Sequence, residues 1–127
     1  MFLFETFEPG AMIGTGSLIL DAKLVRRWHT LFPEDRASDV MPAGMTAVVL
    51  IRTYSDLLQP RPPGNIHGAQ VFEVTRLPRL GDTIKTILTC QSKEMRGERR
   101  WVRFNLDATA ADGTALFTGL MTTLWAK

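Results

Sequence analysis

The segment from Gly44 to Leu58 most constrains what this chain can fold into. Charged residues interrupt it only at Arg52 and Asp56, and its apolar residues cover most of a helical circumference: Met45, Val48, Val49, Leu50, Ile51, Tyr54, Leu57 and Leu58. It is too short for a membrane-spanning helix, which needs about 20 apolar residues. A helix that is apolar nearly all round is buried in a folded protein. The rest of the chain must therefore wrap this helix.

The residues after His67 have the alternating pattern of β-strands, in four segments: 69–77, 83–91, 100–110 and 115–125. Short connections join them, so antiparallel pairing of successive strands is expected. Gly97 marks one turn, and Asp112-Gly113 is typical of a type I′ hairpin turn. The sequence predicts an α+β fold in which a long antiparallel sheet wraps one central hydrophobic helix.

The strand patterns also predict which residues face the core, namely Ile84, Leu88, Cys90, Val102, Phe104, Leu106 and Ala108. The last segment is apolar on both faces, which favours a central position or a covering partner. Before the central helix we expect a strand from Ser17 to Leu20 and a helix starting at Ala22. Asp21 suits the N-cap of that helix, and Pro33 ends it near Phe32.

Composition narrows the class of protein. A length of 127 residues indicates one domain, residues 1–127. The net charge of +2 is spread along the chain, unlike the clustered excess of nucleic-acid binders, so we expect no nucleic acid as partner. The single Cys90 excludes an internal disulfide, and the N-terminus has no signal-peptide pattern. We expect a soluble cytoplasmic protein without membrane contact.

In order along the chain, four segments resemble one family: "LILDAKLVRRWHTLFPED", "MPAGMTAVVLIRTYSDLL", "VTRLPRLGDTIKT" and "GERRWVRFNLDATAADGTALFTGLMTTLW". Together they resemble the MaoC-like dehydratases, also called R-specific enoyl-CoA hydratases, over roughly residues 14 to 126. The resemblance implies a hot-dog fold and the reversible hydration of a 2-enoyl thioester to a 3-hydroxyacyl thioester. It implies a coenzyme A or carrier-protein thioester as substrate and no cofactor. It also implies a homodimer, or a heterodimer with another hot-dog chain, paired sheet edge to sheet edge with the acyl site at the seam.

The chain departs from the family at its catalytic motif. Active members carry Asp-x-Asn-Pro-x-His before the central helix, whereas this region reads "PEDRASDVMPAG". Asp35 falls about where the motif's Asp would lie, but no Asn-Pro and no His follow it. At the start of the helix, Ala43 replaces the family's usual His. Hydratase/dehydratase, acyl-CoA thioesterase and non-catalytic acyl-binding or partner subunit therefore all remain open.

The candidate catalytic residues are Asp35 and His29. By the order of motifs, Asp35 is the best candidate for a carboxylate that activates water. The alternative is a solvated loop acid, since ionised carboxylates are normally exposed, and Glu34 and Asp39 compete for the role. His29 is the candidate second group, or else a residue of the helix surface. Substrate-binding candidates form the helix start: Pro42, Ala43, Gly44 and Met45.

In that helix start, the backbone N–H groups of Gly44 and Met45 are expected to be free and to bind a thioester oxygen. The alternative is a helix start without a ligand. His67 is expected to lie far from this point, and Cys90 to be a core residue. No metal site is expected. Four arginines either bind phosphate or protect a strand edge: Arg96, Arg99, Arg100 and Arg103.

Overall fold

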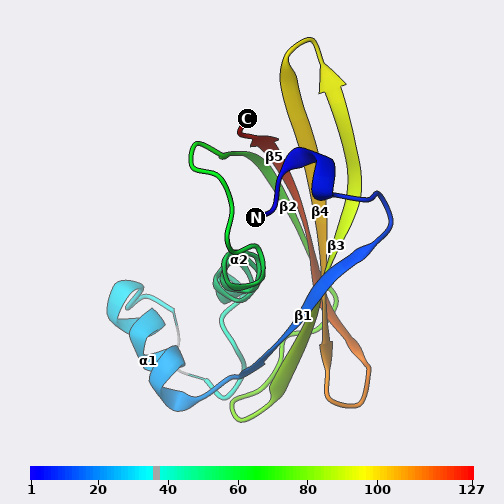
Figure 1. The fold of residues 1–127 in the computed structure, drawn as a ribbon. Helices are drawn as coiled ribbons and strands as arrows, with labels where there is room; N and C mark the ends of the chain where they lie inside the picture. Colours follow the sequence, from blue (N-terminus) through cyan, green and yellow to red (C-terminus); the bar gives the residue numbers. More distant parts are fainter. Residues whose placement is uncertain (36–37) are drawn as a thin grey trace.

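The computed structural model describes residues 1–35 and 38–127. Its helices are η1 (Phe4–Thr6, a 3₁₀ turn), α1 (Ala22–Leu31) and α2 (Met45–Leu57), and its strands are β1 (Met12–Ile19), β2 (Ile66–Val74), β3 (Thr83–Arg96), β4 (Arg99–Ala110) and β5 (Ala115–Trp125). The strands form one antiparallel sheet in the order β1-β3-β4-β5-β2. Figure 1 shows this sheet curving around α2, which confirms the predicted wrapped-helix architecture. None of the described helices is long and apolar enough to span a bilayer.

The sheet order corrects the expected pairing of successive strands. β3, β4 and β5 do form a meander, but β2 pairs with β5 at the opposite edge from β1. The connection from β2 to β3 therefore crosses one end of the sheet and is held there by backbone bonds. Met41 N–H donates to the Pro78 carbonyl at 2.8 Å, and Leu20 N–H donates to the Asp82 carbonyl at 2.9 Å.

β1 begins at Met12, five residues before the expected Ser17, and ends at Ile19. Its two glycines, poor strand formers, hid the start of the strand from sequence patterns. They face α2, because a Cβ built on Gly14 lies 3.1 Å from Leu57 Cδ2 and one on Gly16 lies 3.1 Å from Thr53 Cγ2. The missing side chains thus let the helix lie directly on the strand.

The core lies between the sheet and one side of α2. The inward residues predicted on β3 and β4 are confirmed, since each is at most 2% exposed. α2 itself is covered incompletely: Leu50 is fully buried, but Val48 and Ile51 are 36% and 38% exposed. The expectation of an all-round buried helix is therefore wrong for a single chain, because one five-stranded sheet covers only one side of a helix.

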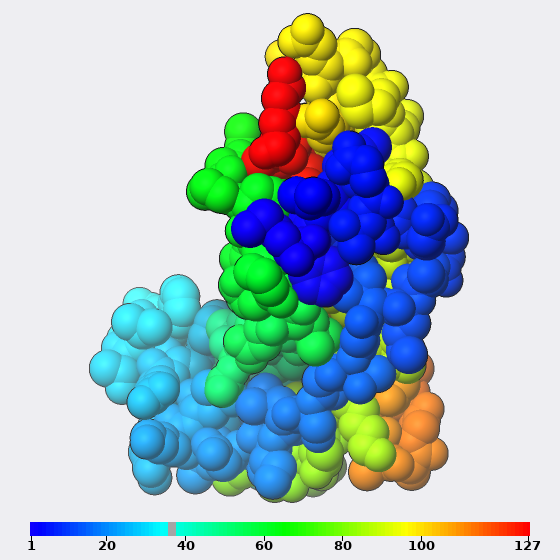
Figure 2. Space-filling view, viewed as in Figure 1, coloured from blue at the N-terminus to red at the C-terminus, as the bar shows by residue number. Residues whose placement is uncertain are grey.

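An aromatic cluster joins the N-terminal segment to the sheet. Phe7 packs edge-on against Phe104 and Trp125, with ring centroids 5.2 and 5.0 Å apart, and Trp125 Nε1 donates to the Phe2 carbonyl at 2.9 Å. Figure 2 shows this segment, in dark blue, lying between the green α2 region and the yellow β3–β4 hairpin. The N-terminal segment thus adds buried aromatic side chains to the core, and no periodicity in the sequence predicted them.

The β4–β5 hairpin is confirmed, but its turn is not of type I′. That type needs positive φ at both central residues, and here only Gly113 has it, at 87°. The Asp112 carboxylate instead accepts bonds from the Thr114 N–H at 2.9 Å and its hydroxyl at 2.6 Å. These bonds lower the pKa of Asp112 and favour a longer loop with one left-handed glycine.

Candidate functional site

An open cavity of about 360 Å³ lies at the N-terminal end of α2. It is lined by Asp35, Ser38, Val40, Met41, Pro42, Ala43, Gly44 and Leu77. The structure therefore brings together four of the six site residues predicted from the sequence. Of the three competing acids, only Asp35 lines the cavity. Glu34 is exposed outside it, and Asp39 pairs instead with Arg79, whose Nη1 lies 3.2 Å from Asp39 Oδ2.

Trp28 fixes the position of Asp35. The Trp28 Nε1–H donates to Asp35 Oδ2 at 2.5 Å, and the Asp35 N–H donates to the Phe32 carbonyl at 3.2 Å. Asp21, which accepts the Leu24 N–H at 2.8 Å, caps α1 as predicted and so sets the start of the helix that carries Trp28. An exposed carboxylate is thus tethered through both its backbone and its side chain.

The same indole packs directly on Gly44. A Cβ built on Gly44 would lie 2.7 Å from Trp28 Cζ2 and 2.8 Å from Cη2, which is too close for any real side chain. Gly44 has φ −63° and ψ −24°, an ordinary helical conformation open to every residue. Glycine is therefore required here for the close approach of Trp28.

The first turn of α2 offers fewer free donors than expected. The Met45 N–H already donates to the Pro42 carbonyl at 3.0 Å, and the Met45 side chain is fully buried. The expectation that the Met45 N–H is free is therefore wrong. Gly44 N–H has no backbone acceptor among the described residues, so it is the donor that can face the cavity. The positive end of the helix dipole adds to its attraction for a negative oxygen.

Neither histidine lies at this cavity. His29 is half-buried on α1, and its Nε2 is enclosed without a hydrogen-bond partner in the described part of the chain. His67 lies near the start of β2, whereas Leu77 follows the other end of that strand. Because a strand rises 3.3–3.4 Å per residue, His67 and Leu77 are more than about 20 Å apart. Asp35 is thus the one titratable side chain that lines the cavity, as far as residues 1–35 and 38–127 show.

Of the remaining candidates, Cys90 and two of the arginines of β3 and β4 have contacts that explain them without a ligand. Cys90 is fully buried, and burial raises the pKa of its thiol, so it is a core residue. Of the four arginines, Arg96 and Arg103 each lie 3.0 Å from Glu94 Oε1. The hydrogen bond from Arg103 is the main cause of a lowered pKa of Glu94. Within the described residues no group of three or more His, Cys, Asp or Glu side chains is arranged to hold a metal ion.

Sequence reasoning missed the role of Trp28. It lies on the apolar side of α1 and packs against the core, and the structure also brings it onto Gly44 and into a hydrogen bond with Asp35. The available signal was a tryptophan seven residues before the candidate acid. An indole N–H needs a partner when partly buried, and Asp35 is the acceptor that supplies it.

Comparison with known proteins identifies the fold. No family model matches the chain, and no curated protein matches it. Among solved structures, the MaoC-like dehydratase of Rhodospirillum rubrum aligns with a TM-score of 0.84 at 13% identity, over 100% of this chain and 99% of that one.

Two further structures share the arrangement. The HadBC (3R-hydroxyacyl-ACP dehydratase) complex of Mycobacterium tuberculosis gives a TM-score of 0.76 at 15% identity, covering 91% of this chain and 96% of that one. The fluoroacetyl-CoA-specific thioesterase FlK, in complex with fluoroacetate and CoA, gives 0.71 at 16% identity, covering 93% and 94%. At these identities the likeness shows the fold alone: the chain has the hot-dog fold of MaoC-like dehydratases.

Proposed function

We propose that this chain is an acyl-thioester hydratase/dehydratase of the MaoC-like type, acting on a 2-enoyl or 3-hydroxyacyl thioester of coenzyme A or a carrier protein. The observation that carries the proposal is Asp35, a carboxylate tethered by Trp28 in the lining of the cavity at the start of α2. It lies where the resemblance to the family expects the catalytic acid. The fold of dehydratases among the similar structures supports the same reaction class.

In the proposed hydration, the thioester carbonyl lies at the first turn of α2. The Gly44 N–H donates to its oxygen and stabilises the enolate that forms there. Asp35 takes a proton from water while the water oxygen bonds to the β-carbon. The same carboxyl group then gives that proton to the α-carbon, so that one water is added and Asp35 is again ionised. Dehydration is the reverse sequence.

A thioesterase is the second candidate, and the lone carboxylate favours it. With no histidine in the lining as described, Asp35 can direct water at the carbonyl carbon rather than the β-carbon. The fold is compatible, since FlK is a thioesterase. Hydrolysis breaks the C–S bond and releases a free thiol, which hydration does not.

A subunit that is inactive alone is the third candidate. The exposed apolar residues of β2, with Ile66 57%, Val71 54% and Val74 47% exposed, lie at a free sheet edge. Val48 and Ile51 of α2 are exposed as well. Both features favour a second hot-dog chain against this edge, either another copy or a different catalytic chain.

To test this, the purified chain is incubated with crotonyl-CoA, and two quantities are measured: the loss of the enoyl absorbance and the release of free thiol. Hydration predicts loss of absorbance without thiol. Thiol release assigns the chain to thioester hydrolysis instead. If neither signal changes at high protein concentration, the chain is not a catalyst by itself, and co-purification with a second hot-dog chain becomes the expected result.

A further inference from the structure

A second cavity, of about 210 Å³, lies between α1, the end of β1 and α2, and three basic side chains line it. Lys23 and Arg27 come from α1 and Arg52 from α2. The apolar lining consists of Leu18, Ile19 and Leu24. Asp21 supplies the one carboxylate among these seven lining residues, and its Oδ1 already accepts the Leu24 N–H. Three positive charges and one negative charge leave this lining at +2.

This gathering of like charge at one cavity favours the binding of an anion. Lys23 and Arg27 are four residues apart on one helix, and like charges at that spacing repel and destabilise a helix. Arg52 adds a third cation from the neighbouring helix. Neither Lys23 nor Arg27 takes part in any ion pair found among the described residues. The arginines of the β3–β4 hairpin differ, because Glu94 binds two of them.

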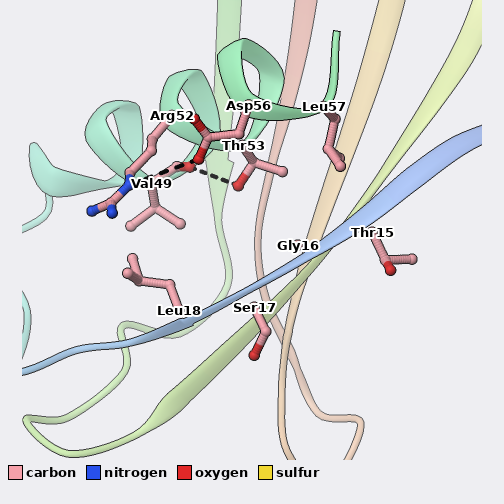
Figure 3. A pocket seen from close by; sticks show the side chains of 9 residues that line it. All are labelled: Thr15, Gly16, Ser17, Leu18, Val49, Arg52, Thr53, Asp56 and Leu57. Atoms are coloured by element: carbon pink, nitrogen blue, oxygen red, sulfur yellow. Dashed lines mark hydrogen bonds and ion pairs between the residues drawn. The ribbon is translucent and has the colours of Figure 1, made fainter. Parts of the chain in front are cut away.

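Arg52 keeps its binding groups free. It contacts Asp56 through Nε alone, at 3.9 Å from Asp56 Oδ2. Figure 3 shows its two terminal nitrogens turned away from Asp56. A guanidinium edge with two parallel N–H donors matches the paired oxygens of a phosphate. The arrangement therefore favours a phosphate group over a single small anion such as chloride.

An adjoining cavity extends the site along the groove between β1 and α2 (Figure 3). It measures about 230 Å³ and shares Leu18 and Arg52 with the basic cavity. Thr53 and Asp56 line it and offer oxygen acceptors. Such acceptors suit the hydroxyl and amino groups of a sugar and a base, so the groove has a basic end for phosphate and a polar end for the rest of a nucleotide.

We propose that this groove binds the nucleotide end of a coenzyme A thioester, with a phosphate group of that nucleotide held by Lys23, Arg27 and Arg52. The inference rests on the proposed function for its choice of ligand. Coenzyme A ends in an adenosine that carries a 3′-phosphate and a diphosphate, whereas the arm of a carrier protein carries a single phosphodiester. A basic groove of this kind therefore selects coenzyme A thioesters over carrier-protein thioesters.

The test is titration calorimetry of the native chain at low ionic strength with adenosine 3′,5′-bisphosphate, adenosine 5′-monophosphate and inorganic phosphate. The bisphosphate binds most tightly. Arg27→Gln and Arg52→Gln each weaken its binding about tenfold, as expected for a lost hydrogen bond to a charged group. Arg26→Gln is the matched control, because Arg26 is next to Arg27 but outside the cavity lining, and binding stays unchanged.

Three results overturn the inference: no binding of the bisphosphate, equal losses in Arg26→Gln and Arg27→Gln, or inorganic phosphate bound as tightly as the nucleotide. The last assigns the site to free phosphate. The outcome is separable from that of the proposed function, because calorimetry needs no turnover. An active enzyme whose KM for crotonyl-CoA is the same in Arg27→Gln contradicts this inference alone. An inactive chain that binds the bisphosphate contradicts only the proposed reaction.

Discussion

At the scale of single residues, Gly44 and Trp28 show what a sequence pattern can and cannot predict. The pattern correctly placed Gly44 at the start of the central helix, but it left open whether this glycine serves a ligand or only begins the helix. The packing that requires glycine there was not predictable, because the residue that needs the space, Trp28, lies sixteen positions earlier and on another helix. Only packing brings the indole onto the glycine, and only then does its N–H reach Asp35.

Gly44→Ala is expected to displace the Trp28 indole and release Asp35, while the backbone conformation at position 44 remains available to alanine. The misplaced carboxylate lowers kcat on the thioester substrate by about tenfold to hundredfold. Trp28→Phe causes a similar loss, because it removes the N–H donor. Combining the two changes adds little, because phenylalanine lacks the ring atoms that clash; fully additive losses contradict the coupling.

The Cys90 thiol is expected to be unreactive in the folded protein. It is fully buried, and its raised pKa keeps it protonated at pH 8, where an ordinary exposed cysteine is partly a thiolate. An aromatic disulfide reagent that reports free thiols measures this directly. The native chain gives no signal until denaturant is added, and rapid labelling of the folded protein contradicts the assignment to the core.

At the scale of elements, the helices were more predictable than the edge strands. The cap at Asp21 and the helical spacing of apolar residues predicted the ends of both helices to within about one residue. β1 was largely missed, because Gly14 and Gly16 have no side chains to show alternation, although they are the residues on which α2 packs. The N-terminal aromatics were missed for a different reason, since a short irregular segment has no period to detect.

Gly16→Val is expected to push α2 away from β1, because the added side chain meets Thr53 Cγ2. Such overpacking lowers the free energy of unfolding by about 1–3 kcal/mol. Ser17→Val on the same strand is the matched control, since Ser17 is exposed and valine favours strands. Urea denaturation measures both, and equal stabilities of the two variants contradict close packing of helix on strand.

At the scale of the whole molecule, the wrapped architecture followed from the sequence but the strand order did not. Alternation gives the faces of a strand, whereas nothing in it tells which edge β2 will join. The answer lies in the backbone bonds of the connection between β2 and β3, which bind Leu20 and Met41 from distant parts of the chain. The partly exposed side of α2 also belongs to this scale, because the described residues of one chain form a single five-stranded sheet, which covers one side of the helix.

The free β2 edge is expected to be the contact with a second chain. Val71→Lys places a charge at this edge and shifts the purified protein to monomers, as measured by light scattering. Ile87→Lys is the control, because Ile87 is comparably exposed on β3, which is enclosed between β1 and β4. A native chain that is already monomeric, or dissociation by both variants alike, excludes the β2 edge as the interface.

The most direct test of the central claim is a crystal structure of the chain with an unreactive ketone analogue of the substrate. In this analogue the acyl chain is saturated and a methylene group separates the carbonyl carbon from the sulfur of coenzyme A. At the proposed site, the carbonyl oxygen is expected to lie within about 3 Å of the Gly44 amide nitrogen. The Asp35 carboxylate faces the β-carbon and keeps its bond to Trp28. An acyl group bound away from the start of α2, or an Asp35 carboxylate turned from it into solvent, contradicts the proposed site.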